Sequence, residues 1–113
     1  MTETDFPSRG FEREILKVMV IMHLSRHGGY PYALLKAIQG KKIWMLRSVT
    51  KSDLYNAIAF LEKRGFIRSK TMLKGAVARK NYFLTMKGKG IVKSARERAK
   101  ESFREVLKEM NEI

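Results

Sequence analysis

Residues 50–64 place hydrogen-bonding and cationic side chains on one face of a short predicted helix. Leu54, Ala57, Ile58 and Leu61 recur at three- and four-residue spacing, which predicts that the opposite face is buried. Hydroxyl, amide and ammonium groups on a slim helix surface can bond to the base edges in a DNA major groove. The candidate DNA-contacting residues of this helix are Thr50, Lys51, Ser52, Tyr55, Asn56 and Lys63.

The ends of this helix carry recognisable local signals. Thr50 and Asp53 have the spacing of a capping box, and a carboxylate in the first turn suits the positive end of the helix dipole. Gly65 is expected to end the helix after Arg64. An ordinary amphipathic core helix would show the same pattern, so this stretch alone leaves DNA contact and a purely structural role open.

The charge of the chain is concentrated in one part of it. The 113 residues have a net charge of +13, and residues 63–100 carry thirteen bases and one acid. Such an excess predicts a polyanionic partner, and nucleic acid is favoured over an anionic membrane surface. Four of these basic residues bracket the tip of a predicted hairpin at residues 66–84. They are expected to contact DNA phosphates rather than nucleobases, and they are Lys70, Lys74, Arg79 and Lys80.

Other functional classes find little support in the sequence. Cysteine is absent, which excludes disulfides and thiolate metal sites and suggests a cytoplasmic protein. No apolar run is long enough to span a membrane. No nucleophile–base pair or phosphate-binding glycine loop is present, so we predict neither an enzyme nor a cofactor. His23 and His27 have metal-ligand spacing but no complementary ligands nearby, so we predict no metal site. Trp44 either walls an effector pocket, of unknown ligand, or belongs to the core.

The elements expected to position these residues form a single domain. Periodicity and turn residues predict a flexible arm at 1–10, helices at 11–27 and 30–39, an extended segment within 41–49 that packs beside the later sheet, and the helix at 50–64. Strands follow at 66–71 and 80–84 around a tip at 72–79, and then a helix from Met86 to Asn111. This order is mainly α with a small β-hairpin wing. It predicts a winged helix-turn-helix domain at 11–85 and a long C-terminal dimerisation helix at 86–113.

Two helices have more apolar surface than one small domain covers. The first is apolar on nearly every side, and the last carries an apolar stripe that is too wide for a solvated helix. A second copy of the chain is therefore the expected partner. The predicted dimer-interface residues are Ile15, Val18, Met22, Val92, Ala95, Ala99, Phe103, Val106, Leu107 and Met110.

Four stretches resemble the PadR-like family of transcriptional regulators. They are Gly29-Tyr-Pro-Tyr-Ala-Leu-Leu-Lys36, then Leu54-Tyr55 with Ile58, Leu61-Glu62, Gly65 and Ile67, then Arg79-Lys-Asn-Tyr82 with Leu84-Thr85 and Gly88, and the long last helix. The resemblance covers residues 11–113. It implies a homodimeric transcriptional repressor that binds double-stranded DNA, with the helix 50–64 in the major groove and the wing 66–84 on the backbone. It also implies that the last helix forms much of the dimer contact.

Two positions depart from the family pattern. Ser52-Asp53 stands where the family favours Gly-Thr or Gly-Ser, and Asn56 stands where it commonly has proline. Asp53 therefore either accepts a hydrogen bond from cytosine or only caps the helix. The alternative function is a non-specific nucleic-acid-coating or RNA-binding winged-helix module, which would use the same charge without recognising bases.

Overall fold

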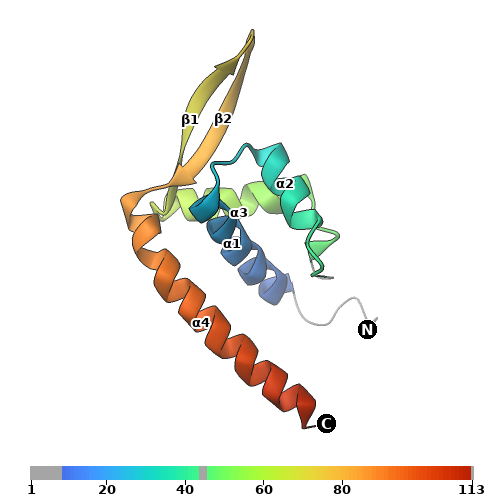
Figure 1. Ribbon diagram of the computed structural model, residues 1–113. Coiled ribbons are helices and arrows are strands. Elements are labelled where there is room, and N and C mark those ends of the chain that lie inside the picture. The colour runs from blue at the N-terminus through green and yellow to red at the C-terminus, as the bar shows by residue number, and fades with distance from the viewer. Residues whose placement is uncertain (1–8, 44–45, 113) are drawn as a thin grey trace.

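The computed structural model describes residues 9–43 and 46–112, with every side chain in them except those of Arg9, Phe11 and Lys74. Its elements are, in order, α1 (Arg9–Arg26), α2 (Pro31–Gln39), α3 (Lys51–Lys63), β1 (Ile67–Lys74), β2 (Val77–Leu84) and α4 (Met86–Asn111). The first three helices form a compact body, from which the β1–β2 hairpin and α4 project in opposite directions (Figure 1). This arrangement confirms the predicted fold class.

Local signals set the helix ends. The Asp53 N–H donates to Thr50 Oγ1 over 3.1 Å and the Thr50 N–H donates to Asp53 Oδ2 over 2.9 Å, which completes the predicted capping box of α3. The Thr85 hydroxyl accepts from the Gly88 N–H at the start of α4, whose bounds are those predicted. α1 begins at Arg9, so it includes the last two residues of the predicted arm, while residues 1–8 lie outside the described residues.

One hydrophobic core joins the three short helices to the base of the hairpin. The predicted rear face of α3 is buried in it, and its members are Leu54, Ala57, Ile58 and Leu61. α1 contributes Leu16, Val20, Ile21 and Leu24. Burying a side chain of this size stabilises the fold by about 1.5–3 kcal/mol, so the core holds α3 firmly with its polar face outward.

The hairpin strands are longer than predicted. They pair antiparallel from Ile67 opposite Leu84 at the base to Lys74 opposite Val77 at the tip, where Gly75 and Ala76 form the turn. Gly75 has a φ of +65°, and a two-residue hairpin turn favours glycine where φ is positive. The predicted tip is centred on Gly75 as expected, but its extent of 72–79 was wrong, because this tight turn lets strand pairing continue through most of it.

The segment between α2 and α3 also differs from its prediction. In its described part, the Leu46 N–H donates to the Ile43 carbonyl over 2.9 Å and the Val49 N–H donates to the Leu46 carbonyl over 3.3 Å, which makes consecutive turns rather than a strand. Leu46 and Val49 are buried, so their apolar character serves the helical core. The centre of the predicted extended segment, Trp44 and Met45, lies outside the described residues.

The residue that pairs with the hairpin comes from the α1–α2 turn instead. The Gly29 N–H donates to the Tyr82 carbonyl over 3.0 Å, and the Tyr82 N–H donates to the Gly29 carbonyl over 2.7 Å. A Cβ on Gly29 would lie 2.9 Å from Cγ of Leu34, so the close approach depends on glycine. This contact connects the turn between the first two helices to β2.

Gly88→Ala should destabilise the fold, whereas Gly90→Ala should not. A Cβ on Gly88 would lie 2.0 Å from the Phe66 carbonyl oxygen, which accepts the Thr85 N–H, whereas a Cβ on Gly90 would meet nothing within 4 Å. We expect Gly88→Ala to lower the free energy of unfolding by about 1–3 kcal/mol or more. Gly90→Ala should raise it by about 0.5–1 kcal/mol, because alanine favours a helix interior over glycine. Urea unfolding of both variants measures the difference, and equal effects would contradict the packing argument.

Candidate nucleic-acid interface

The front of α3 is exposed. Its rear face is held in the core and its N-terminus by the capping box, so the polar front has a fixed orientation. All six side chains predicted to contact DNA from this helix are exposed: Thr50, Lys51, Ser52, Tyr55, Asn56 and Lys63. The Lys51 ammonium lies 5.8 Å from the centroid of the Tyr55 ring, so a charge and a hydroxyl-bearing ring lie side by side.

Asp53 is used within the helix end. One of its carboxylate oxygens accepts the Thr50 N–H, and its own N–H is bonded to the Thr50 hydroxyl. The side chain is half-buried. Of the two roles left open for Asp53, the capping role is the one that this structure contains.

Two cations on α3 itself form no salt bridge within the described residues. Within residues 9–43 and 46–112 the salt bridge joins Lys17 and Glu14, with 3.0 Å between Nζ and Oε1. Lys51 and Lys63 on α3 have no such partner in the described part of the chain. A positive surface without paired acids keeps its attraction for phosphate.

The hairpin divides its cations between its two faces. Directly opposed residues share a face, so Lys70 (opposite Asn81) lies on the same side as Arg79 (opposite Met72). Lys80, opposite Thr71, lies on the other side, which continues from the buried base. All three of these predicted wing residues are exposed, and the side chain of the fourth, Lys74, lies outside the described residues. Each face of the hairpin thus presents at least one basic side chain to phosphates on its side.

A second group of cations surrounds the end of α3 and was not predicted. Two cations lie against the Phe60 ring: the Lys17 ammonium is 3.7 Å from its centroid and the Arg64 guanidinium is 4.4 Å from it. The Lys87 ammonium donates to the Arg64 carbonyl over 2.9 Å. The four-residue spacing of Phe60 and Arg64 could have indicated part of this group, whereas Lys17 comes from α1 and only tertiary packing brings it here.

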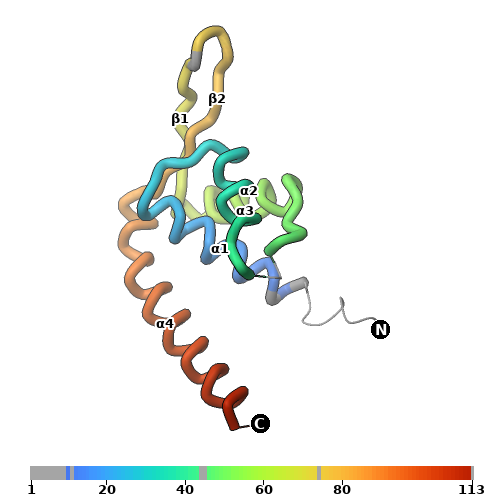
Figure 2. Tube along the Cα trace, turned by 45° about the vertical axis from the view of Figure 1, so that its right-hand side comes forward, coloured from blue at the N-terminus to red at the C-terminus, as the bar shows by residue number. Residues whose placement is uncertain are grey.

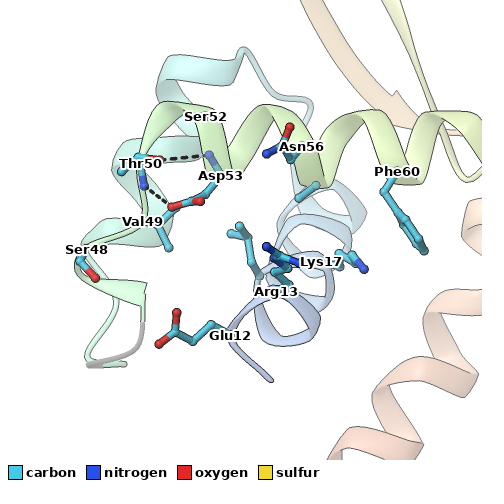
Figure 3. A pocket seen from close by; sticks show the side chains of 12 residues that line it. Glu12, Arg13, Lys17, Ser48, Val49, Thr50, Ser52, Asp53, Asn56 and Phe60 are labelled. Carbon is cyan, nitrogen blue, oxygen red and sulfur yellow. Dashed lines mark hydrogen bonds between the residues drawn. The ribbon is translucent and has the colours of Figure 1, made fainter. Parts of the chain in front are cut away.

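A cleft of about 630 Å³ lies between α1 and the first half of α3 (Figure 3). Ser52 and Asn56 line it on the α3 side, and Arg13 and Lys17 line it on the α1 side. The front of α3 is therefore accessible from this flank as well. Glu12 also lines the cleft and Lys17 is paired with Glu14, so its edge is polar rather than uniformly positive.

The predicted dimer residues fall into two groups. Phe103, Val106, Leu107 and Met110, in the half of α4 that extends beyond the body, are 47–60% exposed. Ile15, Val18 and Met22 of α1 and Val92, Ala95 and Ala99 of α4 are half-buried within the single chain. Figure 2 shows the free end of α4 well away from the other helices. The contact between two copies stays a prediction.

The two histidines lie together, with 5.2 Å between their ring centroids. Burial lowers the pKa of His23, and the nearby charges of His27, Arg26 and Lys41 lower it further. Among the described residues no group of three or more His, Cys, Asp or Glu side chains could hold a metal ion.

Solved structures of transcriptional regulators share this architecture over most of the chain. A PadR-family regulator from Eggerthella lenta matches with a TM-score of 0.72 and 25% identity, covering 89% of this chain and 86% of the other. A regulator from Clostridium thermocellum matches with a TM-score of 0.74 and 26% identity over 89% and 95% of the two chains. This chain has a PadR-like winged helix-turn-helix fold. The predicted resemblance is confirmed.

The PadR-like fold also matches a structure that contains DNA. Bacillus subtilis PadR in complex with operator DNA is 23% identical, with a TM-score of 0.61 over 71% of this chain and 45% of PadR. No protein-family model and no curated protein matches the sequence.

The PadR-like structures that match are transcription regulators rather than enzymes, in agreement with the predicted class. Within the described part of the chain, no helix combines the length and the apolar character needed to cross a membrane.

Proposed function

We propose that this chain is a sequence-specific double-stranded DNA-binding transcriptional regulator that acts as a homodimeric repressor. The helix α3 enters the major groove, and the wing, residues 66–84, lies along the flanking backbone. The observation that carries the proposal is the geometry of α3, a capped helix with a buried apolar rear and an exposed front of amide, hydroxyl and ammonium groups. The PadR complex with operator DNA supports it through a shared fold.

A second copy is the natural cover for the free end of α4. Residues 86–100 carry six bases and one acid, and residues 101–112 carry four acids and two bases. Two α4 helices packed antiparallel would bring the basic half of each against the acidic half of the other. A register that places the small Ala95 opposite the large Met110 also places Ala99 opposite Val106, which allows close packing.

Binding-site selection with the purified protein tests the proposal. Random duplexes are enriched over several rounds, sequenced, and compared with unselected duplex at fixed salt. We expect a palindromic motif whose half-sites are separated by one helical turn, about 10–10.5 base pairs, or a multiple of it. Equal affinity for selected and unselected duplex would instead favour the non-specific coating function.

Asn56→Ala should weaken binding to the preferred site without affecting folding. The exposed Asn56 amide has the paired donor and acceptor that suit adenine, so its removal should cost about 1–3 kcal/mol and relax the motif at one position per half-site. Asn111→Ala, which removes the same exposed side chain at the far end of α4, is the matched control. Site selection and a melting curve are measured for both variants. An unchanged motif for Asn56→Ala, or a large fall in Tm, would give Asn56 a structural role.

A further inference from the structure

The tip of the wing carries apolar side chains that the fold does not use. Leu73 is 78% exposed, Val77 54% and Met72 40%, although the core lies at the base of the same hairpin. The neighbouring tip residues Gly75, Ala76 and Ala78 are small, so Leu73 and Val77 stand out from a narrow end. Exposed apolar groups at the end of a long hairpin contribute nothing to the stability of the free protein, which points to a binding role.

The tip stands clear of the helices. Pairing continues for about 16 Å beyond Ser69, at about 3.3 Å per residue, before the turn at Gly75. Figures 1 and 2 both show the hairpin extending past the body of the domain. A B-DNA minor groove is about 6 Å wide and 7.5 Å deep, so this length allows the tip to enter a groove while the base of the hairpin stays with α3.

The charge around the tip determines which partner fits it. The strands and their turn, residues 67–84, contain five bases and no acid. Below the tip, Lys70 and Arg79 lie on one face and Lys80 on the other. The DNA minor groove is narrow, has walls of deoxyribose and lies between two rows of phosphates. An apolar tip with a basic side chain on either side fits such a groove. An apolar protein surface would match the tip but not these basic side chains.

We propose that the wing tip enters the minor groove beside each half-site and inserts Leu73 between two base pairs. Leu73 unstacks one base-pair step and bends the duplex, and Val77 packs against a sugar. The basic side chains below the tip contact the two rows of phosphates. The inference rests on the proposed function and adds a second source of sequence preference. Pyrimidine–purine steps unstack easily, so a flexible step is favoured at the position of the tip.

The test uses the full-length protein and the duplex obtained by site selection. The bend is measured by energy transfer between dyes on the two DNA ends, and unstacking by the fluorescence of 2-aminopurine placed in turn at each flanking position. We expect a bend of about 20–90° and one brightened position per half-site. Leu73→Ala should abolish the brightening, reduce the bend, and weaken binding by about tenfold with an unchanged salt dependence.

Two variants serve as controls. Leu73→Ile keeps a branched apolar side chain of the same size and should retain the bend and the brightening. Met86→Ala removes an apolar side chain that is 83% exposed at the start of α4, away from the tip, and should behave like the wild type. Because Leu73 is exposed, all the variants should melt together.

Several outcomes would overturn the proposed insertion of Leu73. These are a wild-type complex with straight DNA, a bend without any brightened position, or Leu73→Ala with both signals intact. A change in the sedimentation of free Leu73→Ala would make the tip a contact between proteins and overturn it too. Failure to select any preferred duplex contradicts the proposed function itself, whereas a sequence-specific complex with unperturbed base stacking contradicts only this inference.

Discussion

Raising the salt concentration from about 50 to about 200 mM should weaken binding to the preferred duplex by about 10⁵-fold. If each subunit contacts about five phosphates, the dimer releases the counterions of about ten, which gives a slope of about −9 for log affinity against log salt. The exposed cations of α3 and the wing supply the charge for these contacts. Fluorescence anisotropy at several salt concentrations measures the slope.

The wing should account for a defined share of that slope. Replacing Arg79 and Lys80 with alanine removes two bases per subunit and should flatten the slope by about 4 in the dimer while leaving the selected motif unchanged. Arg104→Ala with Lys108→Ala removes two exposed bases from the far half of α4 and should leave the slope unchanged. An altered motif with an intact slope would mean that these wing residues contact bases rather than phosphates.

Placing two carboxylates in the apolar stripe of α4 should convert the protein to a monomer. Val106→Asp with Met110→Asp puts charges where the proposed partner helix packs, and burying them unpaired is strongly unfavourable. Each subunit should remain folded, because residues 101–112 are exposed and lie outside the core. Loss of the linkage between two half-sites should then lower the affinity for the palindrome by about 10²–10⁴-fold.

Sedimentation, circular dichroism and DNA binding together decide this prediction. Lys108→Asp places a carboxylate on the same turn but away from the stripe, so it should remain a dimer with normal affinity. A double variant that stays dimeric would place the subunit contact on another surface. A monomer that binds the palindrome as tightly as the wild type would show that the two half-sites are not linked through α4.

Features determined by neighbours in sequence could be predicted without the structure. The capping box of Thr50 and Asp53, the bounds of α4 and the buried rear of α3 depend on spacings of three or four residues, which a helix brings together by its own geometry. The motifs along the chain also identified the PadR-like fold, which the solved structures confirm. The concentration of bases between Lys63 and Lys100 needed only the sequence.

Other features depend on contacts between residues far apart in sequence, and the tertiary structure alone decided them. The Gly29–Tyr82 pairing took the place predicted for residues within 41–49, because the backbone beside β2 is chosen by how α1 and α2 pack. The hairpin register put Lys80 on the opposite face from Lys70 and Arg79 and left Leu73 exposed at the tip. A shift of one residue in that register would exchange the two faces, and the core at the base of the hairpin fixes it by burying Ile67, Tyr82 and Leu84.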